Sequence, residues 1–523
     1  MTQAPAEEEH NPWLVGFVVS LAAFMEVLDT TITNVSLNHI AGTLGASQDE
    51  STWIITSYLV ANGIVLPLSG WLSAVLGRKR FFMLCIATFT ATSFACGMST
   101  SLTMLIAFRL LQGLSGGGLQ PVQQAIILDA FPPQMRGAAF GITGVTMIVA
   151  PILGPTLGGY ITDNFSWQWI FFMNVPVGIF ALIMVARVVE DPPHARAHWT
   201  GAIDYIGLLL IAIGLGSLQV VLDKGQQEDW FGSSFIIFFA SASAICLISA
   251  IAWLQRQKDP VVDLRLLSIP TFGLSFIMMF FVGASLYAGA TLLPILTQSE
   301  FGFDATLAGL VLSPSGIAVI FLMPIAGRLV NKVQARYLIA AGMLLCSIGM
   351  FMTMRISPQT DYASFVFMRI MQVIGLPFLF IPTSALAFSR IPKEKSSKAS
   401  AIFAMARNLG GSIGIAIMAG YVVRHEQIHQ SYLVNHLSSS DIGYRTALSH
   451  HVNSALAHGH SLAGATGGAI RRIYGQLAHQ ADIMAFDDGF AVVGVTMATL
   501  AILALFMPDN NPRRQLDPEV VAH

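Results

Sequence analysis

Hydrophobic runs recur along the whole chain, and polar segments separate them. Each run is about 20 residues long, which is the length that a helix needs to cross a hydrocarbon layer of about 30 Å. Most connections are short, so neighbouring helices are expected to be antiparallel. The pattern predicts fourteen membrane-spanning helices, over residues 13–36, 51–72, 81–98, 102–121, 137–160, 167–187, 203–222, 233–254, 271–296, 306–329, 337–354, 364–388, 399–423 and 487–507.

The composition favours a membrane protein over a soluble one. Of the 523 residues 54% are hydrophobic and 11% are charged, whereas soluble domains carry about 25% charged residues. The net charge of −2 does not suggest a nucleic-acid partner. The first ten residues are acidic and no cleavage site follows the first apolar run, so no cleavable signal peptide is expected. The cysteines fall in apolar runs or at their ends and are interpreted as packing residues: Cys85, Cys96, Cys246 and Cys346.

Lysine and arginine give the orientation, because they stay on the cytoplasmic side of a membrane. If the N-terminus is inside, 18 of the 27 basic residues fall in cytoplasmic segments, 6 fall outside and 3 lie within spans. Four of the six outer residues lie in the one long loop, where the rule is weak. Both termini are therefore predicted to be cytoplasmic.

An internal repeat relates the two ends of the chain. Three pairs of similar segments are separated by nearly equal offsets of 260, 257 and 262 residues, which places spans 1–6 against spans 9–14. The paired segments are 109–112 with 369–372, 67–70 with 324–327, and 136–140 with 398–402. Two six-helix halves with two extra helices between them are the plan of an all-α polytopic transporter whose halves rock around a central site.

The repeat also divides the chain. The predicted parts are a cytoplasmic tail (1–12), an N-terminal half (13–187), two additional helices (203–254), a C-terminal half (271–507) that includes a long periplasmic loop (424–486), and a second cytoplasmic tail (508–523).

The first span contains two carboxylates, Glu26 and Asp29, and a charge inside a membrane helix is expensive. Because they are three residues apart, they are expected to share one face of the helix. Such a pair can carry protons by being neutral in one conformation and ionised in another, and Asp29 is the favoured carrier. The alternative is a pair of carboxylates in a wet vestibule that takes no part in coupling.

Three arginines also lie within spans. Arg109 is expected to pair with a first-span carboxylate, since a lone buried guanidinium is costly. Alternatively, Gln112 and backbone carbonyls hold it as a structural residue. Its repeat mate Arg369, together with Arg407, is predicted either to orient anionic substrates or to brace the second half.

Two glycine-containing motifs point to moving interfaces. The segment from Gly154 and Pro155 to Gly158 and Gly159 lies in the fifth span, where small residues permit close helix contact and proline kinks the helix. The turn after the second span contains Gly70, Gly77 and Arg78, whose cation can pair with helix ends across a closed inner face. Ordinary packing and positive-inside charge are the competing explanations.

The long loop 424–486 holds eight histidines, and His425 and His429 have a spacing that can bind zinc. No cysteine accompanies them, so a solvated, partly helical loop that offers a docking surface is favoured and no metal is predicted. The sequence contains no GxxxxGK[ST] motif, which argues against an ATPase. No cofactor is expected.

These motifs resemble those of the major facilitator superfamily, and fourteen spans resemble its drug:proton antiporter subfamily. The segments 28–32, 70–80, 109–113 and 154–159 carry the resemblance, and the segments 167–176 and 216–224 are similar to EmrB-type multidrug exporters of Gram-negative bacteria. The resemblance covers nearly the whole chain. It implies proton-driven export of hydrophobic or amphipathic toxic compounds across the inner membrane. It also implies a periplasmic adaptor (membrane fusion) protein of the EmrA type and an outer-membrane channel of the TolC type as partners.

The sequence departs from the family pattern at two positions. Ala74 stands where the turn motif usually has an acidic residue. Glu26 stands where an amide is usual, which is expected either to change the proton stoichiometry or to favour cationic substrates. The pocket is expected to be apolar and aromatic, with Phe24, Tyr58 and Tyr287 as candidates. Two alternatives remain open: a dedicated exporter of one metabolite such as a fatty acid or siderophore, and a scaffold or sensor without transport.

Overall fold

The computed structural model describes residues 11–132, 135–192, 204–435, 437–438, 440–459 and 461–508. The predicted tails lie almost wholly outside these residues, as do five basic or histidine positions of the sequence analysis: Arg196, His436, His460, Arg513 and Arg514. Within the described residues, fourteen helices are long and apolar enough to cross a membrane. This number is the one that the hydrophobic pattern predicts.

The N-terminal half contains six spans, several of which are built from two helical segments. The helices are α1 (Pro12–Leu44), α2 (Gln48–Ser51), α3 (Trp53–Leu76), α4 (Arg78–Gly97), α5 (Leu102–Gly116), α6 (Leu119–Ala130), α7 (Arg136–Asn164), α8 (Trp169–Phe172) and α9 (Asn174–Val188). The fourth span is longer than expected, because the helix resumes as α6 after the break at the glycine run 116–118.

Local sequence signals set the ends of the first helices. The Asn11 side chain accepts a hydrogen bond of 3.0 Å from the Trp13 backbone N–H, and α1 ends at Gly45 with a φ of 64°, where glycine costs least. A capping box between Ser47 and Glu50 then starts α2. These caps make α1 longer than the apolar run, which ends near residue 36.

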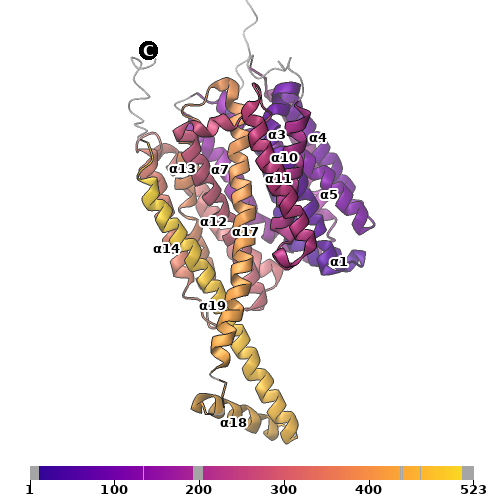
Figure 1. The fold of residues 1–523 in the computed structure, drawn as a ribbon, viewed down its shortest axis with the longest axis vertical. Helices are drawn as coiled ribbons and strands as arrows, with labels where there is room; N and C mark the ends of the chain where they lie inside the picture. The colour runs from indigo at the N-terminus through magenta and orange to yellow at the C-terminus, as the bar shows by residue number, and fades with distance from the viewer. Residues whose placement is uncertain are drawn as a thin grey trace, which may run out of the picture.

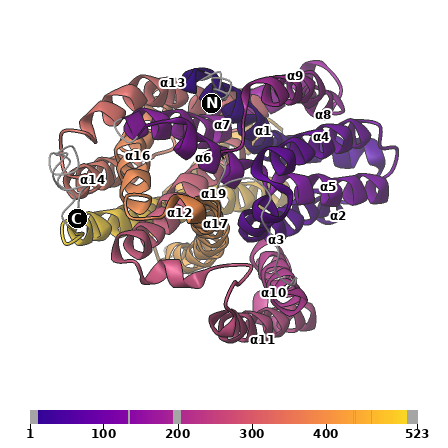
Figure 2. The same cartoon turned by 90° about the horizontal axis from the view of Figure 1, so that it is seen from above.

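Two helices follow the first half, α10 (Tyr205–Lys224) and α11 (Ser234–Arg256). They lie beside the bundle (Figure 2). Helix α10 packs against α3, and α11 packs on the outer side of α10. The Ser243 hydroxyl of α11 donates a 3.0 Å hydrogen bond to the Gly214 carbonyl of α10, where small residues let the two backbones approach.

The C-terminal half repeats the six-span plan. Its helices are α12 (Pro270–Ser299), α13 (Ala305–Leu329), α14 (Ala335–Thr353), α15 (Tyr362–Val373), α16 (Leu376–Ala387), α17 (Ser396–Val434), α18 (Ile442–Ala457) and α19 (Leu462–Ala504). The Asp361 side chain caps α15, and hydrogen bonds from Ser364 lower the pKa of Asp361, which favours its charged form at a helix N-terminus.

Helices α17 and α19 continue far beyond the bundle, and α18 joins their outer ends (Figure 1). This projection, residues 424–486, is largely helical, although the sequence analysis expects a loop with only partial helix. The reason is its composition: it is polar enough to leave the membrane and contains no proline that would end either helix.

The halves meet along two lines. Helix α7 of the first half packs against α13 of the second, and α3 packs against α17. Each of these pairs has one member in spans 1–6 and one in spans 9–14. A space between these two helix pairs is therefore lined by residues of both halves.

Candidate substrate and proton site between the two halves

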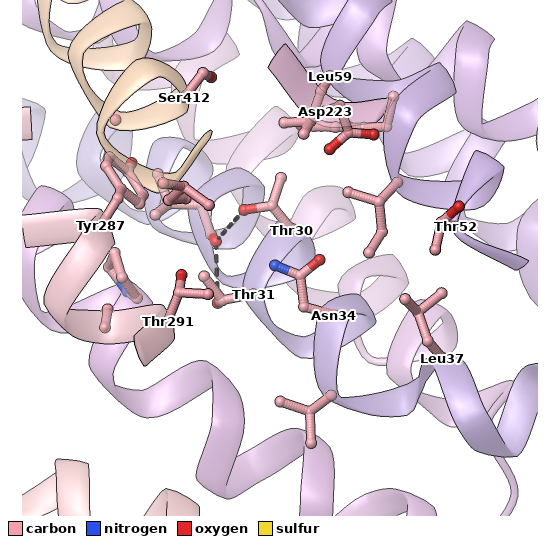
Figure 3. A pocket seen from close by; sticks show the side chains of 18 of the residues that line it. Thr30, Thr31, Asn34, Leu37, Thr52, Leu59, Asp223, Tyr287, Thr291 and Ser412 are labelled. Atoms are coloured by element: carbon pink, nitrogen blue, oxygen red, sulfur yellow. Dashed lines mark hydrogen bonds between the residues drawn. The ribbon is translucent and has the colours of Figure 1, made fainter. Parts of the chain in front are cut away.

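A cavity of about 580 Å³ lies between the halves. Its lining residues come mainly from α1, α3, α5, α6, α7, α10, α12 and α17 (Figure 3). The lining includes the predicted tyrosines Tyr58 and Tyr287, but Phe24 packs against the hydrophobic core instead. Most of the lining surface is apolar, as the sequence analysis expects, and amides and hydroxyls are frequent among the lining residues. Examples are Thr30, Thr31, Asn34, Asn62, Gln120, Gln219, Thr291, Gln298 and Ser412.

Glu26 lines this cavity although it is only 2% exposed. Its Oε1 accepts hydrogen bonds from the Tyr58 hydroxyl at 2.9 Å and from Asn62 Nδ2 at 3.0 Å. Its Oε2 accepts a hydrogen bond from Gln120 Nε2. Three neutral donors satisfy the carboxylate oxygens, and none of the three brings a positive charge to balance an ionised Glu26.

Asp29 has a different environment. The residue is only 2% exposed, and it does not line the cavity. Its Oδ2 lies 2.5 Å from Arg109 Nη1, while its Oδ1 accepts hydrogen bonds from Gln112 at 3.2 Å and Asn174 at 2.7 Å. The predicted pairing of Arg109 with a first-span carboxylate is therefore present in the geometry. Gln112 also accepts a 2.9 Å hydrogen bond from Arg109, so it holds both partners of the ion pair.

Tyr58 separates the two carboxylates. Its hydroxyl donates to Glu26, and its ring lies under the Arg109 guanidinium, with Cζ 4.3 Å from the ring centroid. Glu26 and Asp29 thus lie on one side of α1, as their spacing predicts, but they contact separate groups. Glu26 lines the cavity, whereas Asp29 does not, although its counter-ion Arg109 does.

Arg407 connects this cluster to the second half. Its guanidinium donates a hydrogen bond to Gln120 Oε1, while the amide of the same Gln120 donates to Glu26. Arg407 also forms a side-chain hydrogen bond with Tyr287 of α12. A chain of contacts therefore runs from the α1 carboxylate through α6 to α17.

Arg369, the repeat mate of Arg109, does not line the cavity. It is 1% exposed and donates a 3.0 Å hydrogen bond to Gln372, which mirrors the contact of Arg109 with Gln112. No salt bridge to Arg369 occurs among the residues that the structure describes. The predicted substrate-orienting role thus has no cavity contact to support it, and the bracing alternative fits the placement better.

The turn after α3 lies where the halves close against each other at one end. A Cβ placed on Gly70 would lie 2.7 Å from Lys398 Cα, so only glycine permits this approach. Gly77 has a φ of 82°, a left-handed conformation that glycine adopts readily. Arg78 donates 3.1 Å hydrogen bonds to Ser396 and Ser397 of the opposite half.

Arg78 also forms an ion pair with Asp129 at the end of α6. Ala74 replaces the acidic residue that is usual in this motif, and Asp129 supplies a carboxylate to the same arginine. At the same end, Gly137 of α7 packs against the Gly327 backbone, where an added Cβ would lie 2.5 Å from the Gly327 oxygen.

The glycine and proline run of α7 packs against α1. A Cβ on Gly154 would overlap the Thr31 side chain, and one on Gly158 would lie 3.1 Å from the Ile32 carbonyl oxygen. Gly159 is buried, and Pro155 lines the cavity. The run thus brings α7 close to α1 next to the cavity, and its role as a hinge stays a prediction.

The histidines of the projection are separate from this cavity. No cluster of three metal-binding side chains occurs in the described parts of the chain. His429 lies 2.7 Å from Asp488 of α19, and His479 lies 2.6 Å from Glu300 at the end of α12. These contacts tie the base of the projection to the bundle.

Comparison with known proteins identifies the fold family. Residues 19–415 match the sequence profile described as Major Facilitator Superfamily. The chain belongs to this superfamily. The similar superfamily members include the multidrug export protein EmrB of Haemophilus influenzae, which is 35% identical over 81% of this chain and 83% of its own. The fatty acid resistance protein FarB of Neisseria gonorrhoeae is 34% identical over 85% of this chain and 87% of its own.

Solved structures of the superfamily agree with the fold. The human organic anion transporter MFSD10 (TETRAN) matches 95% of this chain and 100% of its own with a TM-score of 0.59 at 16% sequence identity. Membership of the superfamily makes the chain a multi-pass membrane transporter rather than an enzyme. It also agrees with the sequence-based resemblance.

Several residues around the two carboxylates and the cavity were not among the site residues that the sequence analysis predicted. Asn62, Gln120 and Asn174 hold the carboxylates, and Asp223 of α10 lines the cavity. The amides within apolar spans were a weak sequence signal of a polar site, because an amide is itself costly in a membrane. This signal did not indicate which of the many span amides lie next to Glu26 and Asp29.

Proposed function

We propose that the protein is a proton-driven efflux antiporter that exports hydrophobic or amphipathic compounds across the bacterial inner membrane. The observation that carries the proposal is Glu26, a buried carboxylate on the wall of a cavity between the two halves. Multidrug export by EmrB relatives supports the substrate class. An intramembrane carboxylate that faces a cavity is the usual location of an exchangeable proton.

The orientation rests on the distribution of basic residues, with both termini cytoplasmic. The cavity is lined by the second half of α1, the start of α3 and the end of α12, which lie at the end of the bundle that carries the projection. With this orientation the cavity faces the periplasm, and the contacts of Gly70 and Arg78 close the cytoplasmic side. The structure then corresponds to an outward-facing state.

Glu26 is proposed as the group that exchanges its proton. It can take a proton from the periplasm while the cavity faces outward, because it lines that cavity. Asp29 and Arg109 both stay ionised next to the Tyr58 ring, and their opposite charges cancel. The pairing lowers the free-energy cost of burying each charge. After the halves rock, a substrate that enters from the cytoplasmic side displaces the proton at Glu26. Arg407, which shares Gln120 with Glu26, lets the second half respond to that change.

Glu26→Gln should abolish substrate-dependent proton release. Glutamine keeps the size of the side chain but cannot ionise, so no proton can be exchanged at this position. The experiment uses reconstituted full-length protein in vesicles with an internal pH dye, and adaptor is left out so that coupling alone is measured. Glu228→Gln, which removes an exposed carboxylate outside the cavity, should behave like wild type.

Asp29→Asn separates two mechanisms in the same assay. If Glu26 exchanges the proton, Asp29→Asn should weaken transport and stability together because Arg109 loses its counter-ion. If Glu26→Gln releases protons normally and Asp29→Asn alone does not, the exchanging group is Asp29 and our assignment is wrong. If wild-type protein releases protons only at the background rate with every compound, proton antiport is overturned and a scaffold or sensor is favoured.

The partners proposed for export to the outside are a periplasmic adaptor of the EmrA type and a TolC-type outer-membrane channel. The projection supports this proposal because it carries exposed apolar side chains outside the bundle. Tyr432 is 66% exposed, Ile442 is 73% exposed and Leu462 is 66% exposed. Exposed apolar side chains on a polar projection are typical of a protein-binding surface.

Ile442→Ser combined with Leu462→Ser should therefore reduce drug resistance in cells and leave vesicle transport unchanged. The loss comes from weaker adaptor binding, since Ile442 begins α18 and Leu462 begins α19, at the outer end of the projection (Figure 1). Thr446→Ala on the exposed part of α18 is the control and should change neither readout. Equal loss in vesicles and cells would mean that the projection acts on transport itself.

A dedicated exporter of one metabolite is the second candidate, and similarity to FarB favours a fatty acid. The polar and acidic residues of the lining argue for cations over carboxylates, because Glu26 and Asp223 would repel an anion. A resistance profile of a deletion strain that is confined to fatty acids would support this second candidate over multidrug export.

A further inference from the structure

Helix α10 belongs to neither half, yet it forms part of the cavity wall. A Cβ on its Gly216 would lie 3.2 Å from Ile64 of α3, so the two helices are in close contact. Towards the other half, Gln219 Nε2 donates a 3.2 Å hydrogen bond to Ser412 of α17. Helix α10 therefore bridges the first and second halves on one side of the cavity (Figure 2).

Three polar residues of this segment line the cavity: Gln219, Asp223 and Gln227. Gln219 and Asp223 are four residues apart on α10, a spacing that places side chains on one face of a helix, and Gln227 follows in the turn after the helix ends. The other residues of the helix are mostly apolar. A polar stripe on an otherwise apolar membrane helix is thus turned to the cavity and not to lipid.

Asp223 is the charged member of the stripe. Its Oδ2 accepts a hydrogen bond from the Thr56 hydroxyl of α3, a neutral group. Figure 3 shows Asp223 facing the same space as Thr30 and Asn34 of α1. Asp29, by comparison, is paired with an arginine and closed off from the cavity.

The neighbouring cation Lys224 attracts the Asp223 carboxylate electrostatically, but its ammonium makes its hydrogen bonds to other groups. Its ammonium donates hydrogen bonds to the Thr52 hydroxyl, to Gln227 Oε1 at 3.1 Å and to the Asp49 carbonyl at 3.3 Å. It also lies 5.0 Å from the centroid of the Trp53 ring. Lys224 is thereby held against the start of α3, and the Asp223 carboxylate remains directed at the cavity.

We propose that Asp223 is a substrate-recognition residue that binds the positive charge of amphipathic organic cations. A largely buried carboxylate loses hydration, and a cationic ligand in the cavity offsets that loss by bringing a second positive charge beside that of Lys224. Tyr287, on the opposite side of the cavity in Figure 3, adds an aromatic ring that can contact the apolar part of the same ligand. The inference rests on the proposed transport of amphipathic compounds and names their charge.

The linker helix therefore does more than connect the two halves. Because its carboxylate is not on α1, recognition of the cation and exchange of the proton are performed by different residues. Glu26 sets proton coupling, and Asp223 sets which compounds are held. This separation allows a test that does not depend on transport.

The test measures binding of tetraphenylphosphonium and tetraphenylborate to the purified full-length protein in detergent. These ions have nearly the same shape and opposite charge. Asp223→Asn should weaken binding of the cation about tenfold, the size of one charge-assisted contact of about 1.4 kcal/mol. Binding of the anion should be unchanged or tighter. Asp223→Glu should restore cation binding, and Glu228→Gln should bind both ions like wild type.

The outcomes are distinct from those of the proton assay. Cation binding that is unchanged in Asp223→Asn overturns the proposal. Equal weakening for both ions, with a lower melting temperature, also overturns it and makes Asp223 a structural brace for Thr56. If Asp223→Asn shows the expected charge preference while wild-type vesicles release no protons, antiport fails and the recognition site stands.

Discussion

Arg109→Ala should destabilise the protein by about 3–5 kcal/mol, because it leaves the buried Asp29 carboxylate without its counter-ion. Gln112 and Asn174 would remain as donors, but neither carries a charge. The Tyr58 ring would also lose the guanidinium that lies 4.3 Å above it. Denaturant unfolding in detergent, followed by tryptophan fluorescence, measures the change.

A second variant distinguishes loss of charge from loss of packing. The double substitution Asp29→Asn with Arg109→Gln removes both charges and should recover part of the lost stability, although it stays defective in transport. Leu110→Ala changes the next residue of α5, which is 42% exposed to the surroundings, and should have little effect. If the free energy of unfolding of Arg109→Ala lies within about 1 kcal/mol of the wild-type value, the Asp29 carboxylate does not need this partner.

Gly70→Ala should reduce transport strongly, and Gly70→Val should abolish it. The new Cβ would lie 2.7 Å from Lys398 Cα and 3.0 Å from the Ser397 carbonyl oxygen, and both of these neighbours are backbone. The closed contact at this end can then form only if α3 and α17 move apart. Protein that cannot close this end leaves the outward-facing state, so the population shifts to an inward-open form.

Two measurements check this prediction. The rate of substrate-dependent proton release in vesicles reports the transport defect, and labelling of a cysteine placed at Ser397 reports opening of the closed end. Gly42→Ala provides the matched control, since a Cβ there meets no atom within 4 Å. Normal transport with low labelling in Gly70→Ala would mean that this contact is dispensable for closure.

Membrane insertion explains why the helices could be predicted from sequence. The free energy of placing a residue in lipid is local, so each apolar run reveals a span without any tertiary information. The recurrence of the segments 109–112 and 369–372 likewise revealed the two halves. The extended helices α17 and α19 were harder to predict, because outside the membrane helix formation depends on capping and packing and not on hydropathy.

The same local cost led to the site residues Glu26, Asp29 and Arg109. Spacing along α1 correctly placed the two carboxylates on one side of a helix, but it could not rank them. Only packing shows that the Tyr58 ring lies between them and that Glu26, not the favoured Asp29, meets the cavity. Arg369 illustrates the opposite case, since repeat symmetry matched its position but no carboxylate pairs with it among the residues that the structure describes.

Sequence by itself thus determined the fourteen spans, the two related halves and the charges that must be matched inside the membrane. Only the tertiary structure decided which groups pair with those charges. Arg407 meets Gln120 across 287 positions of chain, and Asp223 of a connecting helix joins the cavity through Thr56, 167 positions away. Such contacts depend on how helices pack, because the cost of burying a charge is a property of one residue, whereas its compensation depends on neighbours from distant parts of the chain.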